Sequence, residues 1–247
     1  MKTLRLLIAF CFQATALWAA EEKAAAFVHA KPGAQPATPE PPTLGAKPPA
    51  GAIMLFDGKN LDAWATKAGK DWLKEAGPAK WKLLPESGAV EVVPAADSLI
   101  SRAKFGDIRL HAEFRTLGAP TNSGIYFQTR YEVDINETFG RTDGTPSGNL
   151  GNCTPKGTLP KARASRAPLE WQTLDVEFTA PRFDAAGKKT AKARATVLLN
   201  GVEIYREQEL DPPTGAAGRL GEAATGPLML QEHGMALQFR NIWVVPK

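Results

Sequence analysis

The stretch Asp107-Ile108-Arg109-Leu110-His111-Ala112-Glu113-Phe114-Arg115 alternates strictly between apolar and polar residues. Successive side chains of a β-strand point to opposite faces, so this pattern predicts a strand with one buried and one solvent-facing side. His111 falls on the solvent-facing side. The stretch Gln172–Ala180 repeats the pattern, with apolar residues at 174, 176 and 178. Because helical periodicity is almost absent elsewhere, these stretches predict an all-β fold.

A hairpin is predicted around Asn200-Gly201, because this pair readily takes the positive φ angles of a type I′ turn. Its strands are expected at 195–199 and 202–205. Other short apolar or alternating segments predict strands at 53–56, 81–84, 89–93, 124–128, 131–135, 228–231 and 237–245. About ten short strands in one domain predict two packed antiparallel sheets. A short helix is expected at 70–76.

The first fifty residues predict export. A cationic start and an apolar run from Leu6 to Leu17 indicate a signal peptide over residues 1–20. This run is shorter than the ~20 residues that span a bilayer, so we expect no membrane span after its removal. Residues 21–51 are rich in Ala and Pro and predict a disordered linker. The remaining domain, 52–247, is expected in the periplasm or outside the cell.

Composition excludes some classes of protein. The formal net charge is +4, and the basic residues are scattered without interleaved aromatics, so no nucleic-acid partner is expected. One of the two cysteines, Cys11, leaves with the signal peptide, which leaves Cys153 without an internal disulfide partner. The domain is therefore expected to be stabilised by an ordinary apolar core.

The segment Tyr131-Glu132-Val133-Asp134-Ile135-Asn136-Glu137 gathers acidic residues on a predicted strand. Glu132 and Asp134 share one face, ~6.5 Å apart along the strand. A β-bulge at 135–136 would return Glu137 to that face. Repulsion between carboxylates would spread their pKa values, so that one stays protonated and another ionised near neutral pH. The alternative is a strand with a solvated acidic face.

Further candidates flank this strand. Gln231 and His233 share a face near a strand end, where an imidazole suits proton transfer. Asn122 and Ser123 open a neighbouring strand and could hold sugar hydroxyls or form an Asx turn. Arg240 could clamp a substrate oxygen or pair with an acid across the sheet. Two long irregular segments, 139–169 and 210–225, are expected near the site.

Several of these motifs resemble the 3-keto-disaccharide hydrolase domain family, over nearly all of residues 53–247. The motifs that carry the resemblance are Leu55–Leu61 with Trp64, Asn122–Ile125, Tyr131–Val133, Glu170–Thr173, Ala180–Asp184, Leu230–Gly234 and Phe239–Ile242. The resemblance implies a concanavalin A-like jelly roll. It also implies cleavage of glycosides that carry a ketone at carbon 3 of the sugar, by proton abstraction at carbon 2, elimination and hydration.

Such chemistry needs a base, an acid for the leaving oxygen and a group that stabilises the enolate. The resemblance assigns base or metal-ligand roles to Glu132 and Asp134, proton transfer to His233, and sugar or oxyanion contacts to Gln231, Asn122 and Arg240. A divalent cation bound by the two acids could polarise the ketone. The family's middle loop, Cys-Gly-x-Ile-Tyr, reads Cys153-Thr154-Pro155-Lys156-Gly157 here.

Two alternatives remain open. The segment 132–137 also resembles the signature of laminarinase-type glycoside hydrolases. In that case Glu132 would be the nucleophile, Asp134 the modulator and Glu137 the acid/base, with the reacting carboxyls ~5–5.5 Å apart. The other alternative is a non-catalytic carbohydrate-binding module on a Pro-rich arm. In every case the expected partner is an oligosaccharide or glycoside.

Overall fold

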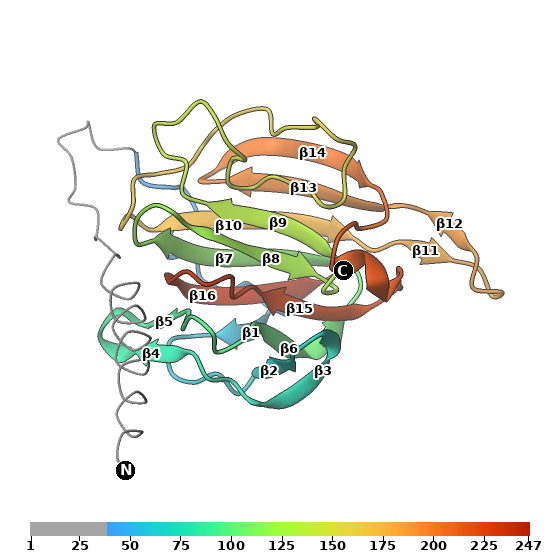
Figure 1. The fold of residues 1–247 in the computed structure, drawn as a ribbon, viewed down its shortest axis with the longest axis horizontal. Helices are drawn as coiled ribbons and strands as arrows, with labels where there is room; N and C mark the ends of the chain where they lie inside the picture. The colour runs from blue at the N-terminus through green and yellow to red at the C-terminus, as the bar shows by residue number, and fades with distance from the viewer. Residues whose placement is uncertain (1–38) are drawn as a thin grey trace, which may run out of the picture.

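The computed structural model describes residues 39–247, and nearly all of their regular structure is β-strand (Figure 1). Two short 3₁₀ turns, η1 (Pro85–Ser87) and η2 (Ala217–Leu220), are the helical elements of this part of the chain. The predicted signal peptide and residues 21–38 of the predicted linker lie outside the described residues. Between residues 39 and 247, no helix has the length and apolar character needed to cross a membrane.

Two large antiparallel sheets form the fold. The six-stranded sheet runs in the order β3 (Asp71–Pro78), β2 (Trp64–Ala68), β6 (Leu99–Phe105), β15 (Gly226–Leu230), β8 (Asn122–Phe127) and β9 (Tyr131–Asn136). The eight-stranded sheet runs in the order β14 (Val202–Leu210), β13 (Ala193–Leu199), β10 (Gln172–Thr179), β7 (Ile108–Thr116), β16 (Leu237–Pro246), β5 (Ala89–Glu91) and β4 (Lys82–Leu84), with β1 (Ile53–Phe56) also pairing with β16. The predicted two-sheet sandwich is confirmed.

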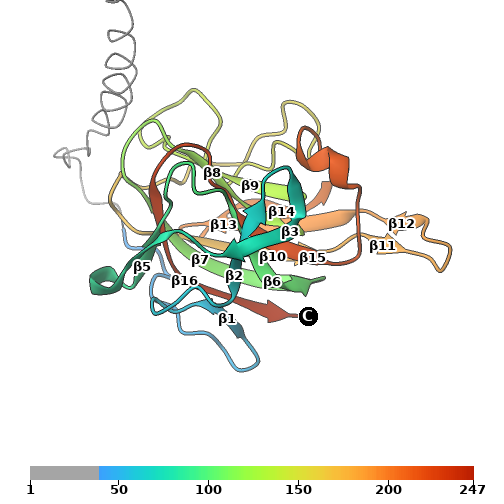
Figure 2. The same cartoon turned by 60° about the horizontal axis from the view of Figure 1, so that its bottom comes forward.

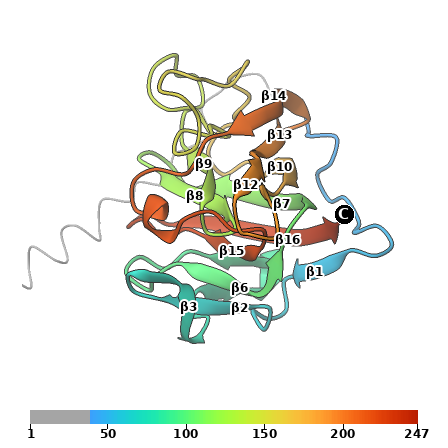
Figure 3. The ribbon, with the colours of Figure 1, turned by 90° about the vertical axis from the view of Figure 1, so that its right-hand side faces the viewer.

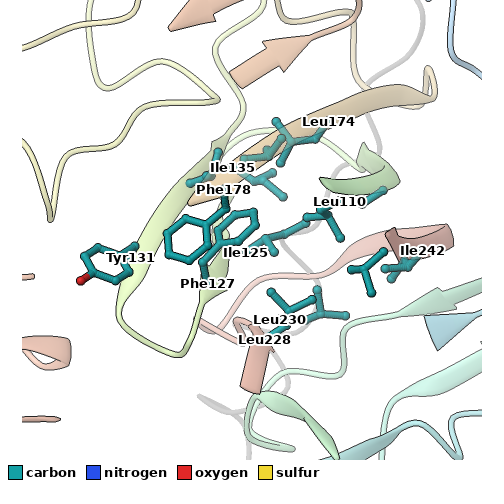
Figure 4. Packing of buried hydrophobic residues seen from close by; sticks show 14 of the residues in the cluster. Leu110, Ile125, Phe127, Tyr131, Ile135, Leu174, Phe178, Leu228, Leu230 and Ile242 are labelled. Carbon is teal, nitrogen blue, oxygen red and sulfur yellow. The ribbon is translucent and has the colours of Figure 1, made fainter. Parts of the chain in front are cut away.

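Apolar side chains from the two sheets meet in one core (Figure 4). Phe127 of β8 stacks on Phe178 of β10, with ring centroids 4.9 Å apart, and Tyr131 packs against the same ring. The alternation that predicted β7 and β10 therefore places their apolar faces toward the opposite sheet. Cys153 is buried and free.

Local sequence was misleading at some elements. The helix expected at 70–76 is wrong, since residues 71–76 lie in β3, which forms a hairpin with β2. The hairpin at Asn200-Gly201 is confirmed, with φ of 54° and 79°. A second hairpin, of β11 (Arg182–Phe183) and β12 (Lys189–Ala191), projects from the sandwich (Figure 2).

The end of the predicted linker, residues 39–51, is not a free tether. It runs along the outer face of the eight-stranded sheet to β1 (Figure 3). Thr43 donates from Oγ1 to Asp175 Oδ2 at 2.6 Å, and the Gly45 amide donates to Glu113 Oε1 at 2.6 Å. We call residues 39–52 the strap. Its composition suggested disorder, but its hydrogen bonds go to carboxylates that are far away in the sequence.

The strap also corrects the expectation for His111. This side chain has no exposed area. It lies 2.7 Å from Asp175 Oδ1 through Nδ1 and stacks on the ring of Trp243. Burial lowers the pKa of His111, but its contacts with Asp175 and Glu113 outweigh burial and raise it overall. The polar face of β7 is therefore covered at His111 and Glu113, whereas Arg109 stays exposed.

Candidate active site

The acidic strand β9 lies at the edge of the six-stranded sheet, beside β8 (Figure 1). The register pairs Tyr126 with Glu132 and Gly124 with Asp134, and paired residues of an antiparallel ladder share a face. Val133 lies between the acids and is buried in the core. Glu132 and Asp134 therefore project together from the face of the sheet that points away from the core, as the sequence predicted.

The bulge that would bring Glu137 to this face is wrong. The pairing of β8 with β9 is continuous from Asn122–Asn136 to Phe127–Tyr131. Glu137 lies beyond the strand, where it accepts hydrogen bonds from the Thr116 hydroxyl of the opposite sheet and from the Phe139 amide. It does not join the acidic pair, which removes the acid/base of the laminarinase-type alternative.

The two carboxyls of the pair have unlike environments. Burial raises the pKa of Glu132 to about 8, with a further increase from the negative charge of Asp134 and an opposing hydrogen bond from Tyr126. Burial also raises the pKa of Asp134 to about 6, against hydrogen bonds from Asn149 and Glu132. Near neutral pH the pair therefore shares one proton, and a carboxylic acid stands beside a carboxylate.

The loop after β9 holds the ionised member of the pair. Gly148 donates its amide to the Asp134 carbonyl at 2.7 Å, and the Asp134 amide donates to the Asn149 carbonyl at 2.9 Å. Asn149 Nδ2 then donates to Asp134 Oδ2 at 2.8 Å, and its own Oδ1 accepts from Tyr205. The expectation that the segment 139–169 lies near the site is confirmed.

On the other side of the pair stands Tyr126, whose pKa is raised by burial and by the charge of Glu132. Gln231 donates from Nε2 to its hydroxyl oxygen at 3.1 Å. The other amide atom, Gln231 Oε1, is buried and has no hydrogen-bond partner. A buried acceptor of this kind is costly unless a ligand or water satisfies it, so it points to a bound polar group beside Glu132.

A small apolar cluster covers this end of the face. Trp72 of β3 meets Tyr126 edge-on at 5.6 Å, and Met229 and Ala217 pack against them. Ala217 belongs to η2, so the second long segment, 210–225, also lies near the site as expected. Together these side chains partly shield the acidic pair from water.

The remaining predicted residues lie in different places. Asn122 is exposed at the start of β8, on the same face as the pair. Ser123 is buried and donates to the Gln231 carbonyl, which makes it a structural residue. His233 is exposed beyond the end of β15. Among the described residues, the structure records no contact of Ser123 or His233 with the carboxyls of Glu132 and Asp134.

Arg240 belongs to the other sheet. Its register partner on β7 is Glu113, and Nε donates to Glu113 Oε2 at 2.6 Å. Its guanidinium lies over the ring of Trp171 at 4.1 Å. Of the two roles predicted for Arg240, pairing with an acid across the sheet is the one observed. Because β16 and β9 lie in different sheets, Arg240 is not part of the acidic pair's surroundings, and the clamp on a substrate oxygen stays a prediction.

Tyr126 and Asn149 were not recognised from the sequence. Tyr126 could have been found, because strand alternation from Asn122 and Gly124 puts it on the same face. Asn149 could not, because it lies in an irregular loop whose path depends on contacts with β9.

The divalent cation expected at Glu132 and Asp134 would find two carboxylates there. Within residues 39–247, no group of three or more His, Cys, Asp or Glu side chains is arranged to hold a metal. Hard cations take about six oxygen ligands, and two carboxyls that share a proton supply few charged ones. The donor set thus fits such a cation poorly. The cation stays a prediction, and no step below is routed through it.

Comparison with known proteins agrees with this fold. A candidate glycosyl hydrolase of Parabacteroides distasonis is 30% identical, with a TM-score of 0.69, over 80% of this chain and 84% of that chain. Two further candidate glycosyl hydrolases of that organism share the fold at 16% and 19% identity, with TM-scores of 0.54 and 0.51. The match at 16% identity covers 80% of this chain and 94% of that chain. The match at 19% identity covers 79% of this chain and 99% of that chain. No protein of curated function matches the chain.

The sequence profile of one family matches residues 51–245, which is nearly the whole described sandwich. With the relative that is 30% identical, this match indicates a carbohydrate-active protein of glycosyl hydrolase type. The chain belongs to the 3-keto-alpha-glucoside-1,2-lyase-like domain family.

Proposed function

We propose that the protein cleaves the glycosidic bond of 3-keto-glycosides by elimination across carbons 1 and 2, followed by hydration. The observation that carries the proposal is the Glu132–Asp134 pair, which holds one proton near neutral pH on a shielded sheet face. A ketone at carbon 3 acidifies the hydrogen at carbon 2, so a carboxylate suffices as base. In an unoxidised glycoside no ketone acidifies the hydrogen at carbon 2, so cleavage would need a different arrangement of acids.

The pair supplies both proton transfers. Asp134, the ionised member, takes the proton from carbon 2, and the electron pair moves into the ketone as an enolate. The enolate collapses, the bond from carbon 1 to oxygen breaks, and the leaving oxygen takes the proton of Glu132. The pair has then gained one proton and lost one. Addition of water across the new double bond restores the hydrogen at carbon 2 and gives the free keto sugar.

The surrounding residues set these roles. Asn149 stabilises the ionised form of Asp134 through its 2.8 Å hydrogen bond, and burial keeps Glu132 protonated. The unpaired Gln231 Oε1 accepts a hydroxyl of the bound sugar. Asn122, exposed on the same face, is placed to contact a more distant part of the substrate. His233, which is exposed, keeps a proposed role in proton exchange with solvent.

The test uses three substrates with the purified protein: a 3-keto-disaccharide, an unoxidised β-glucan and an inert polysaccharide. Release of sugar from the first alone, with solvent deuterium incorporated at carbon 2, is the expected result. Glu132→Gln should abolish release, whereas Glu137→Gln should leave it within about twofold. Release from the β-glucan would refute elimination, and retention without any release would indicate a binding module.

We also propose that the protein acts outside the cytoplasm, on the strength of the predicted signal peptide over residues 1–20. Fractionation of the producing cells tests this. A cytoplasmic protein that retains residues 1–20 would contradict it.

A further inference from the structure

A cavity of about 340 Å³ lies between the loop at 145–159 and Thr214. Asn149 and Gly151 line it, and both adjoin the carboxylate of Asp134. A Cβ atom added to Gly151 would lie 3.6 Å from Asp134 Oδ2 and 2.5 Å from Asn149 Nδ2. Neither acid lines the cavity itself, but Asn149 and Gly151, which has no side chain, are lining residues next to the Asp134 carboxylate.

The lining of this cavity suits a hydroxylated ligand. It contains the hydroxyls of Thr145, Thr154, Thr158 and Thr214. Thr154 donates to the Leu150 carbonyl and Thr214 to the Asn152 carbonyl, both at 3.0 Å, so the oxygen lone pairs of these hydroxyls stay available as acceptors. The volume falls in the range of ~300–1,000 Å³ that small-molecule sites occupy.

Two larger cavities of the described residues, about 520 and 360 Å³, do not compete for this role. Both lie beside the strap on the other sheet, and the larger is lined by Glu113 and Arg240, which are paired with each other. None of the residues that line them hydrogen-bonds to Glu132 or Asp134, whereas Asn149 of the 340 Å³ cavity does. The 340 Å³ cavity is therefore the one that adjoins the proposed base.

Lys156 is the only charged residue among those that line the cavity beside Asp134. Elimination from a 3-keto-glycoside builds negative charge on the oxygen at carbon 3, and a cation close to that oxygen stabilises it. Carbon 3 is bonded to carbon 2, so if Asp134 takes the proton from carbon 2, the ketone oxygen also lies near the cavity. The lining of the cavity includes one lysine, Lys156, whose side chain is exposed.

We propose that this cavity binds the ketone-bearing sugar ring and that the Lys156 ammonium stabilises the enolate oxygen at carbon 3. The inference rests on the proposed function and names the subsite in which that chemistry occurs. Lys156 then acts as a catalytic residue, and the threonines fix the orientation of the ring. The leaving group lies on the other side, toward Glu132 and Tyr126.

The test compares three lysine variants on a 3-keto-disaccharide, with two readouts: release of free sugar and exchange of the carbon 2 hydrogen with deuterated solvent. Lys156→Met should lower kcat about 100-fold and slow the exchange equally, with a smaller change in KM. Lys156→Arg keeps a cation and should retain most of the rate. Lys161→Met is the matched control, since Lys161 in the same loop pairs with Glu203 outside the cavity. It should leave both readouts unchanged.

A fourth variant tests the cavity without touching a charge. Thr158→Phe fills it and should raise KM more than tenfold, while circular dichroism and the unfolding midpoint stay the same. Lys156→Met with kcat and exchange within twofold of wild type, in a protein that Glu132→Gln inactivates, would overturn the subsite and leave the proposed function standing. A wild-type protein that neither exchanges nor eliminates would overturn both.

Discussion

Asn149 donates a hydrogen bond from Nδ2 to Oδ2 of Asp134 at 2.8 Å, across 15 residues of irregular chain. This bond favours ionisation of Asp134, whereas burial and the charge of Asp134 raise the pKa of Glu132. The loop after β9 is therefore part of the acid–base chemistry as well as a cover for the edge strand.

Removing this donor should change the pH dependence of the reaction. In Asn149→Leu the pKa of Asp134 rises above its present value of about 6, because the hydrogen bond that lowers it is gone. The acidic limb of the kcat/KM profile should then move to higher pH by about one unit. Tyr205→Phe is the control, since Tyr205 contacts Asn149 Oδ1 and not Asp134. An unmoved limb in Asn149→Leu would show that Asp134 is not the base.

The pair should also make stability depend on pH. Both folded-state pKa values, about 8 and about 6, lie above those of the unfolded chain, so the folded protein binds more protons at intermediate pH. The contribution of the pair to the free energy of unfolding is therefore fully present below about pH 4, and it is lost as the pH rises through 6 and 8. Glu132→Gln should therefore unfold with a free energy on the order of 1–3 kcal/mol higher than wild type at pH 9.

Urea unfolding at pH 5, 7 and 9 measures this effect. The Glu137→Gln variant serves as the comparison, because Glu137 lies outside the pair. Equal stability of Glu132→Gln and wild type at all three values would mean that the pair is not buried in solution.

Gly124 should be intolerant of any side chain. A Cβ atom there would lie 2.7 Å from Oε1 of Glu132, on the neighbouring strand. Gly124→Ala should push this carboxyl away from Tyr126 and reduce kcat about 100-fold, because misplacement by ~1 Å costs that much. Gly106→Ala, whose nearest atom would lie at 3.4 Å, is the matched control. Full activity of Gly124→Ala would show that the position of Glu132 is not critical.

The strap should contribute to stability. Glu113 is fully buried, and although burial favours its neutral form, hydrogen bonds from His111, Asn241, Arg240 and the Gly45 amide lower its pKa to about 2. A chain that begins at residue 51 loses the Gly45 donor and exposes this network to water. We expect it to be less stable than a chain that begins at residue 39 by ~2–5 kcal/mol. Thermal unfolding of the two chains decides this, and equal midpoints would make the strap dispensable.

The sequence by itself determined the sandwich and the acidic face. Strand alternation depends on two residues at a time, so it is readable wherever one face is buried and the other polar, as in β7, β9 and β10. Alternation fails to predict a strand whose two faces are both exposed. Residues 71–76 lie in β3, whose mostly exposed side chains carry no alternating signal.

Tertiary structure alone decided which polar residues meet. Arg240 and His111 looked like site or surface residues, yet they share a covered network with Glu113 under a strap that composition marked as disordered. Glu137 is close to the acidic pair in sequence, but the regular end of β9 turns it toward Thr116. Asn149 is further away in sequence, but the loop after β9 brings it to Asp134. Alternation is a local property of the chain, whereas these contacts depend on how distant segments pack, and no local pattern encodes that.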